Sequence, residues 1–325
     1  MVRARSLSMT LVSLLALGGL ASGALAQTYP TKPVLVIAPI VAGGPYDVVA
    51  RGVLQSLAAP LGQSFVMDNR PGANGIVGLD ACAHSAPDGY TLCYVNNSMI
   101  SMNPFVYAKL PYDPPKDLAP VFQVGFLSGV IAGHPSLPPS MREVIELAKQ
   151  RPNTLAFSSL GVGSSQHLYI EWLRQKAGAE FLHVPYKGAP PATAAVVSGE
   201  VQLTANAIGA LSALFQAGKL RPLLVTSPAR SPYLPNVPSF GELGIDLDYR
   251  SWSGFFAPAG TPRPVIDRLN VEMNRAIAEP KFKEAYFDKM TIEPGGGPAQ
   301  AFEAFLRRDR ETTGALVKLA GIKPE

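Results

Sequence analysis

Hydrophobic positions alternate along the chain between short continuous runs and longer segments with helical spacing. The run Val34–Ala38 is short, continuous and β-branched, which predicts a buried strand. Pro39 ends this run, and apolar residues then recur at helical spacing over 45–61. Strands are predicted next at 64–67 and 90–95, with a helix at 76–83 between them. This alternation favours a parallel sheet with right-handed crossovers.

The same alternation continues in the second half of the chain. Ser140, followed three residues later by Glu143, predicts a capping box at the start of a helix over 141–150. Proline-rich segment 104–120 is expected to be irregular, and extended segments 121–132 and 249–257 are expected to cross between two domains. The other predicted strands are 155–157, 180–184, 201–205 and 220–226, and the other predicted helices are 166–177, 192–198, 208–217, 264–278 and 298–320.

Two loops of small residues each join a predicted strand to a predicted helix. Ala42, Gly43 and Gly44 precede a helix that begins with Pro45, and loop 158–165 precedes the helix at 166. Backbone N–H groups of such loops, together with a helix N-terminus, can hold an anion, although the same order also occurs as an ordinary connection. The first loop has neither a dinucleotide-binding nor a P-loop signature. Two loops facing each other would hold an acidic ligand from both sides.

The N-terminus has the features of a secretory signal peptide over residues 1–26. Arg3 and Arg5 precede an uncharged apolar stretch at 11–20, and an Ala-x-Ala site ends at Ala26. The formal net charge of the 325-residue chain is +4, and it falls to +2 without this segment. We therefore expect an exported protein that binds no nucleic acid.

Two cysteines, Cys82 and Cys93, follow the predicted signal peptide. In an oxidising compartment they could form a disulfide between a helix end and the next strand. Two buried free thiols are the alternative, and the sequence leaves both open.

Catalytic and metal-binding signatures are absent from the sequence. The hydrolase pentapeptide Gly-x-Ser-x-Gly does not occur, although Ser164, Ser165 and His167 lie close together at a predicted helix start. We expect these serines to cap the helix or bind ligand. Trp252 could form a wall of the pocket or lie in the core, and we expect the core. The histidines show no zinc-site spacing, so no metal is expected. These histidines are His84, His134, His167 and His183. We expect no cofactor.

Several short motifs occur in one order over the whole chain after residue 28. They include Ala42-Gly43-Gly44-x-x-Asp47, Leu61-Gly62-Gln63, Asn69-Arg70-Pro71-Gly72-Ala73, Pro87-Asp88-Gly89-Tyr90-Thr91-Leu92, Gly161-x-Gly163-Ser164-x-x-His167-Leu168, His183-Val184-Pro185-Tyr186-Lys187-Gly188, Trp252-x-Gly254 and Ala257-Pro258-Ala259-Gly260-Thr261-Pro262.

In this order the motifs resemble the Bug family, the extracytoplasmic substrate-binding receptors of tripartite tricarboxylate transporters. The resemblance implies an α/β, two-domain periplasmic-binding-protein fold of the type II, Venus-flytrap kind. Each lobe would be a mixed, mostly parallel sheet flanked by helices. Lobe 1 would comprise 27–127 plus 250–325, lobe 2 would comprise 128–249, and residues 1–26 would be the signal peptide.

The resemblance also implies a ligand between the lobes, held mainly by backbone groups of the two loops. Asp47 either keeps amines among the possible ligands or stabilises the helix N-terminus by its charge, and we expect the second role. Family members often carry Phe-Pro where this chain has Ile40-Val41, which would reshape the pocket. The expected ligand-binding residues are Ile40, Ala42, Gly43, Gly44, Tyr46, Asn97, Ser98, Ser158, Ser159, Gly163, Ser164 and Asn206.

The resemblance therefore predicts a monomeric periplasmic carrier and not an enzyme. Its partners would be a small carboxylate and two inner-membrane transporter subunits. The carboxylate could be a dicarboxylate, a tricarboxylate, an amino acid or an aromatic acid. Two alternatives are a sensory module that presents its ligand to a membrane receptor kinase, and a secreted serine hydrolase.

Overall fold

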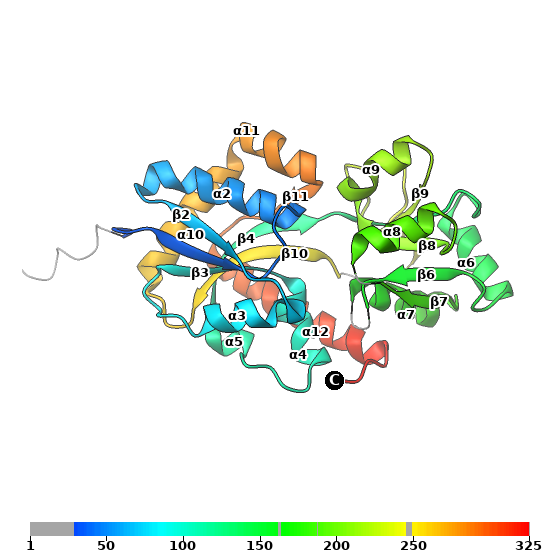
Figure 1. Ribbon diagram of the computed structural model, residues 1–325, viewed down its shortest axis with the longest axis horizontal. Coiled ribbons are helices and arrows are strands. Elements are labelled where there is room, and N and C mark those ends of the chain that lie inside the picture. Colours follow the sequence, from blue (N-terminus) through cyan, green and yellow to red (C-terminus); the bar gives the residue numbers. More distant parts are fainter. Residues whose placement is uncertain (1–28, 162–163, 187, 245–248, 325) are drawn as a thin grey trace, which may run out of the picture.

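The computed structural model describes residues 29–161, 164–186, 188–244 and 249–324, and these form two lobes side by side (Figure 1). The first lobe contains a six-stranded sheet in the order β11-β4-β10-β3-β1-β2, and the second a five-stranded sheet in the order β7-β6-β8-β5-β9. The strands are β1 (Val34–Ala38), β2 (Phe65–Asn69), β3 (Thr91–Asn96), β4 (Leu118–Leu127), β5 (Gly129–Gly133), β6 (Ala156–Ser159), β7 (Leu182–Pro185), β8 (Leu203–Ala207), β9 (Arg221–Val225), β10 (Ser251–Pro258) and β11 (Ile292–Pro294).

Both sheets are mixed, as the sequence predicts, but they contain less parallel pairing than expected. In the first sheet β1 pairs in parallel with β2 and β3, whereas β10 is antiparallel to β3 and β4, and β11 is antiparallel to β4. In the second sheet β6 is parallel to β7 and β8, whereas β5 is antiparallel to β8 and β9. The antiparallel pairs involve the strands β4, β5 and β10, which lie at the crossings between the lobes.

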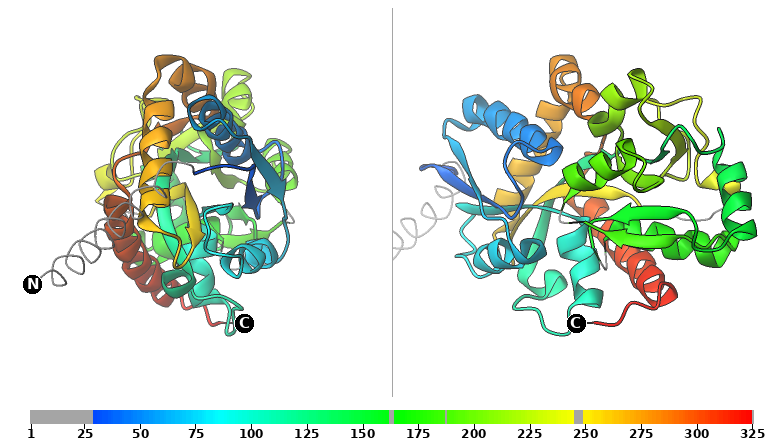
Figure 2. Two further views of the ribbon diagram at one scale, coloured as in Figure 1. Left: turned by 90° about the vertical axis from the view of Figure 1, so that its left-hand side faces the viewer. Right: turned by 45° about the vertical axis from the view of Figure 1, so that its right-hand side comes forward.

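Helices cover both faces of each sheet (Figures 1 and 2). In the first lobe α2 and α10 pack on one face and α3 and α12 on the other, because alternate residues of β1 point to opposite sides. Val34 and Val36 join the α2/α10 cluster, whereas Ile37 joins the α3/α12 cluster. The helices are α2 (Pro45–Leu61), α3 (Ile76–Ala83), α4 (Asn103–Val106), α5 (Pro114–Asp117), α6 (Met141–Gln150), α7 (Ser165–Ala177), α8 (Ala189–Val197), α9 (Ile208–Gln216), α10 (Arg263–Ala278), α11 (Pro280–Phe282) and α12 (Ala299–Leu319).

The C-terminal end of α12 reaches the second lobe. Leu316 and Val317 pack in the same apolar cluster as Trp172 and Leu173 of α7. The first lobe therefore touches the second at this helix end as well as at the two strand crossings (Figure 2).

Some predictions about single elements and residues are confirmed, and one is wrong in part. The capping box at Ser140 is confirmed, since its Oγ accepts from the Glu143 N–H and the Glu143 carboxylate accepts from the Ser140 N–H. Trp252 is fully buried, and its indole N–H donates to Asp309 at 2.9 Å. Segment 104–120 is not wholly irregular, because it contains α5 and the start of β4.

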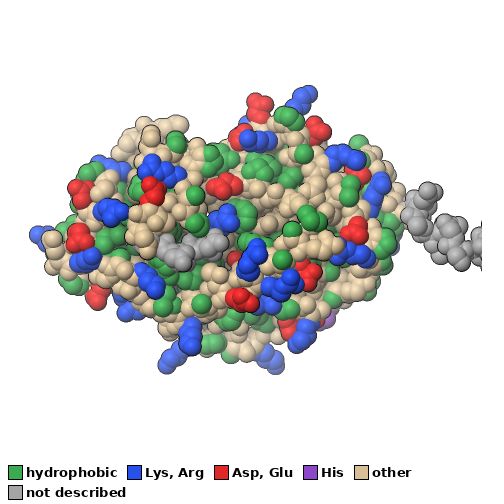
Figure 3. Space-filling model, turned by 180° about the vertical axis from the view of Figure 1, so that it is seen from behind, with side chains coloured by type: hydrophobic (Ala, Val, Ile, Leu, Met, Phe, Trp, Pro, Cys, Tyr) green, Lys and Arg blue, Asp and Glu red, His purple; other side chains and the backbone are tan. Residues whose placement is uncertain are grey.

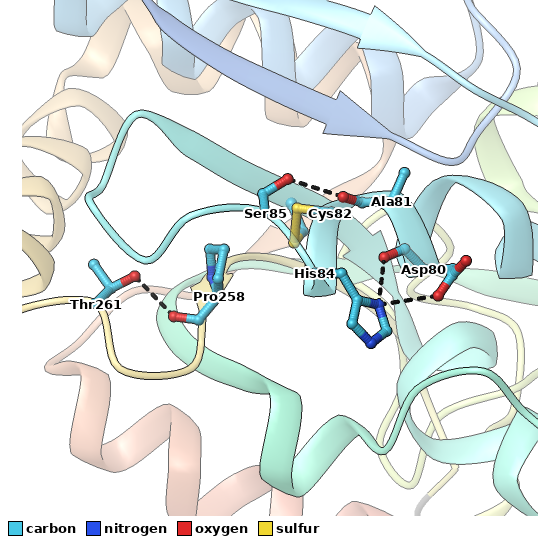
Figure 4. Close-up of a disulfide and its surroundings, with 8 residues drawn as sticks. Asp80, Ala81, Cys82, His84, Ser85, Pro258 and Thr261 are labelled. Carbon is cyan, nitrogen blue, oxygen red and sulfur yellow. Dashed lines mark hydrogen bonds and ion pairs between the residues drawn. A yellow bond between two sulfur atoms is a disulfide. The ribbon is translucent and has the colours of Figure 1, made fainter.

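Cys82 and Cys93 form a disulfide that joins the end of α3 to β3 (Figure 4). The end of α3 is also held by Ser85, whose Oγ donates to the Ala81 carbonyl at 2.8 Å. Of the two alternatives that the sequence leaves open, the structure therefore contains the disulfide.

Charges of both signs lie on the face seen in Figure 3. On the face seen in Figure 3, lysine and arginine side chains are interspersed with acidic ones over both lobes. Within residues 29–161, 164–186, 188–244 and 249–324, no helix is both long and apolar enough to cross a membrane.

Candidate functional site

A cavity of about 530 Å³ lies between the two sheets. It is bounded by the carboxyl end of β3, the crossing from β4 to β5, the end of β8 and the start of α7, where ligands bind in open α/β sheets. None of the described lining residues has a charged side chain. They are Asn74, Asn96, Ser98, Val106, Tyr107, Leu127, Gly129, Val130, Leu160, Ser164, Ser165, Gln166, Tyr169, Ala205, Asn206, Ala207, Thr226 and Ser251.

Two asparagines bring amide groups to the cavity from opposite lobes. The Oδ1 atom of Asn96 accepts from the Ser98 N–H at 3.1 Å, and Oδ1 of Asn206 accepts from the Ala207 N–H at 2.8 Å. No described residue accepts from the Nδ2 atom of either amide. Each asparagine therefore uses its oxygen to order the chain and presents its NH₂ group as a donor for a ligand.

The second loop places the N-terminus of α7 at the cavity. Ser164 is the N-cap; its Oγ donates to the Gly161 carbonyl at 2.7 Å and accepts from the His167 N–H at 3.4 Å. Gln166 ties the helix to β8, because its Nε2 donates to the Ala205 carbonyl at 3.0 Å. The partial positive charge of a helix N-terminus favours an anion at this end of the cavity.

Two histidines stack behind this loop. The rings of His167 and His183 are 4.5 Å apart and nearly parallel, at 7°. Burial lowers the pKa of both, and the neighbouring His167 lowers that of His183 further, while Glu171 opposes the shift. Ser159 Oγ lies 2.5 Å from His183 Nε2, but Ser159 is almost fully buried and does not line the cavity. A nucleophile needs access to its substrate, so this geometry supports a structural role for Ser159 and His183.

The first loop is held by an acid of its own helix. Asp47 accepts from the Gly43 N–H at 2.9 Å, from Arg51 Nε at 3.0 Å and from Asn69 Nδ2 at 2.9 Å. Burial alone would raise the pKa of this carboxyl, but the hydrogen bonds outweigh burial and lower the pKa. With its carboxylate engaged three times inside the first lobe, Asp47 orders the loop, and its role at the helix N-terminus stays a prediction.

Of the predicted ligand residues, the structure brings Ser98, Ser164 and Asn206 together at the cavity. Tyr46 and Asn97 lie one hydrogen bond away, through Ser251. Gly163 falls outside the described residues. The other predicted residues do not line the cavity in this conformation; they are Ile40, Ala42, Gly43, Gly44, Ser158 and Ser159.

Several cavity residues escaped the sequence analysis. Asn74 follows β2 and Thr226 follows β9, so the rule that ligands meet strand ends could have found both. Tyr107 and Ser251 carry no such local signal. They reach the cavity through the tertiary arrangement of the region after α4 and of the crossing into β10.

Comparison with known proteins agrees with this architecture. Residues 49–322 match the family described as the tripartite tricarboxylate transporter family receptor. The chain belongs to this receptor family. It is 36% identical over 312 residues to BugT of Bordetella pertussis, with 95% of each chain covered.

Two solved structures give the same result for the fold. R. palustris Rpa4515 with adipate is 32% identical, with a TM-score of 0.81 over 91% of this chain and 100% of the other. The periplasmic binding protein BugD is 30% identical, with a TM-score of 0.77 over the same shares. The resemblance and the two-lobe fold predicted from the sequence are thereby confirmed. The chain is a periplasmic solute-binding receptor, and its family and fold are those of binding proteins.

Proposed function

We propose that this receptor captures a small carboxylate in the cavity between its lobes and delivers it to two inner-membrane transporter subunits. The observation that carries the proposal is the cavity itself, which combines the N-terminus of α7 with amide and hydroxyl donors and has no charged side chain among its described lining residues. The adipate in Rpa4515 supports a carboxylate as the ligand class.

In this proposal Ser164 and the start of α7 hold one carboxylate, and the amides of Asn96 and Asn206 bind the rest of the ligand. The first loop, over 40–46, joins the site when the lobes close about hinges near 124–130 and 248–254. In this proposal lobe 1 comprises 27–127 plus 250–325, and lobe 2 comprises 128–249. The ligand favours the closed state by binding both lobes at once.

The proposal also includes the cellular location and the oligomeric state of the protein. The protein is exported, its signal peptide is removed after Ala26, and it works in the periplasm as a monomer. Sequencing the N-terminus of the secreted protein tests the cleavage site, and sedimentation tests the assembly state.

A thermal-shift screen tests the ligand class. The mature protein is heated with adipate, with its diamide, and with aliphatic, amino and aromatic acids. A ligand at 100 times its Kd adds about 2.7 kcal/mol to the free energy of unfolding, which gives a measurable rise in Tm. We expect a rise for at least one acid and none for the matching amide.

A control removes ligand carried over from the cell. The screen is repeated on protein that has been unfolded, dialysed and refolded, since a trapped ligand would mask any shift. Refolded protein that responds to no acid, or equally to an acid and its amide, would overturn the carboxylate proposal.

A further inference from the structure

A line of hydrogen bonds crosses between the lobes at the floor of the cavity. Tyr46 OH donates to Ser251 Oγ at 2.8 Å, and Ser251 Oγ donates to Asn97 Oδ1 at 3.3 Å. Asn97 Nδ2 donates to Tyr249 OH at 2.9 Å, and that hydroxyl lies 3.3 Å from Ser165 Oγ. The line starts on the helix after the first loop and ends on the helix after the second. Two of its members, Ser165 and Ser251, line the cavity.

Tyr249 is the point where this line passes from one lobe to the other. Its ring belongs to the apolar core of the second lobe and packs edge-on against Tyr169, with ring centroids 6.4 Å apart. Its hydroxyl accepts from Asn97, which directly follows β3 of the first lobe. Tyr249 and Asn97 are 0% and 1% exposed, so water does not readily replace the bond between them.

The line is uncharged throughout, so its strength does not depend on pH near neutrality. Burial raises the pKa of Tyr249 and Tyr46 well above the ordinary value, and both hydroxyls keep their protons. Tyr249 OH therefore shares two hydrogen bonds, one accepted from Asn97 and one with Ser165 Oγ in which either hydroxyl can be the donor. The orientation of a cavity hydroxyl is thus linked to a bond between the lobes.

We propose that Tyr249 is a positioning residue that couples the angle between the lobes to the cavity hydroxyls of Ser165 and Ser251. A ligand that takes a hydrogen bond from Ser165 changes the partner of Tyr249, and through Asn97 it acts on the first lobe. The role in ligand response rests on the proposed function, whereas control of the lobe angle is a property of the ligand-free protein.

The chain offers a matched control in Tyr94. It is also fully buried, and its hydroxyl donates to Ser253 Oγ at 2.8 Å, but both residues lie within the first sheet. Tyr94→Phe therefore removes a buried tyrosine hydroxyl bond inside one lobe, while Tyr249→Phe removes the bond between the lobes together with the contact to Ser165. The two variants lose the same atom, so a difference between them reports the coupling.

Distance measurement between spin labels tests the lobe angle without any ligand. Labels are attached at Val66→Cys on β2 and Leu182→Cys on β7, which are 53% and 52% exposed and lie on edge strands of the two sheets. The native cysteines are held in their disulfide. We expect Tyr249→Phe to broaden or shift the distance distribution, and Tyr94→Phe to leave it as in the parent. Coincident distributions for both variants would overturn the proposal.

A second variant and a ligand arm complete the test. Ser165→Ala removes only the second-lobe end of the line and should broaden the distribution less than Tyr249→Phe does. An unchanged distribution for Ser165→Ala would contradict the coupling even if Tyr249→Phe failed to fold.

Adipate is then added to the parent and to Tyr249→Phe. If adipate binds, about a tenfold weaker affinity is expected for Tyr249→Phe, and an unchanged affinity would refute the ligand coupling. If adipate does not bind the parent, that result counts against adipate as the ligand of the proposed function. The ligand-free distance distributions still decide whether Tyr249 controls the lobe angle.

Discussion

The two loops that look alike in the sequence are held in different ways. Each follows a buried strand and precedes a helix, yet a carboxylate holds the first, whereas serine hydroxyls hold the second and the described end of the second faces the cavity. In the first, the Gly43 N–H donates to Asp47, and Val41 is 72% exposed. In the second, Ser164 caps a helix whose first residues line the cavity, and Leu160 is 43% exposed.

This difference shows that a strand–glycine loop–helix pattern does not by itself define an anion site. Asp47 occupies the Gly43 N–H as a ligand carboxylate would, so the first loop is ordered before any ligand arrives. The described residues place no acidic side chain on the cavity at the start of α7. No described acidic side chain therefore competes with an external anion at the start of α7.

The largest expected effect comes from removing the internal acid of the first loop. Asp47→Ala removes the acceptor of the Gly43 N–H, of Arg51 Nε and of Asn69 Nδ2. Arg51 and Asn69 keep their hydrogen bond to each other, and Arg51 is half exposed and can be solvated. We expect a loss of about 2–3 kcal/mol in the free energy of unfolding, measured with urea. Glu303→Ala is the control, because it removes an exposed acid–arginine pair with the same spacing and should cost about 0.3–0.5 kcal/mol.

The pH dependence of this effect has a definite sign. The pKa of Asp47 is lowered in the folded state, so its stabilisation is present above the unfolded value near 4 and is lost as the pH falls through the folded value. The difference between the parent and Asp47→Ala should therefore shrink below about pH 4. A difference that stays constant there would mean that the charge of Asp47 is not what orders the loop.

An intermediate effect is expected for the cap of the second loop. Ser164→Ala and Ser140→Ala each remove an N-cap in the second lobe, at α7 and at α6, and each should cost about 1 kcal/mol. Only Ser164 lines the cavity, so only Ser164→Ala should also weaken ligand binding, measured by calorimetry with the acid found in the screen. Equal affinity in both variants would remove Ser164 from the ligand site.

A smaller effect is expected from the stacked histidines behind the second loop. Burial lowers the folded-state pKa of His183, so the unfolded chain binds more protons just below pH 6.5 and stability falls as the pH falls. His183→Gln should therefore lose less stability than the parent between pH 7 and pH 5.5, by less than the cap effect, in thermal melts. His134→Gln is the control for the substitution itself, because the His134 ring hydrogen-bonds to Ser136 and is not part of the stack. A slope for His183→Gln identical to that of the parent would contradict a role for the stack.

Local signals explain how much of the fold could be predicted. The helix at Ile76–Ala83 is found with its predicted bounds, and the Ser140 capping box needs only residues three apart. Strand β11 has only three residues, and the π-helical turn Lys283–Asp288 has no apolar period of its own, so neither was predicted. Strand β11 pairs with β4, and the turn contacts α11, β11 and α2, so both depend on contacts with other elements.

The candidate site divides in the same way. Ser98 and Asn206 were predicted because each lies at the carboxyl end of a strand, where topology alone places ligands. Ser251 was missed because its role depends on Asn97, 154 residues earlier in the chain. No pattern within one segment of sequence reports such a contact between distant parts of the chain.

The smallest effect on stability should come from the exposed apolar tips of the two loops. Val41→Ser and Leu160→Ser change side chains that are 72% and 43% exposed, so each should alter the free energy of unfolding by no more than about 0.5 kcal/mol. Leu160 already lines the cavity, and its replacement should weaken binding directly. Val41 can reach a ligand only if the first loop closes on it. A weaker affinity for Val41→Ser, measured beside Leu160→Ser by calorimetry, would therefore demonstrate closure, whereas parental affinity would leave the second loop as the principal binding element.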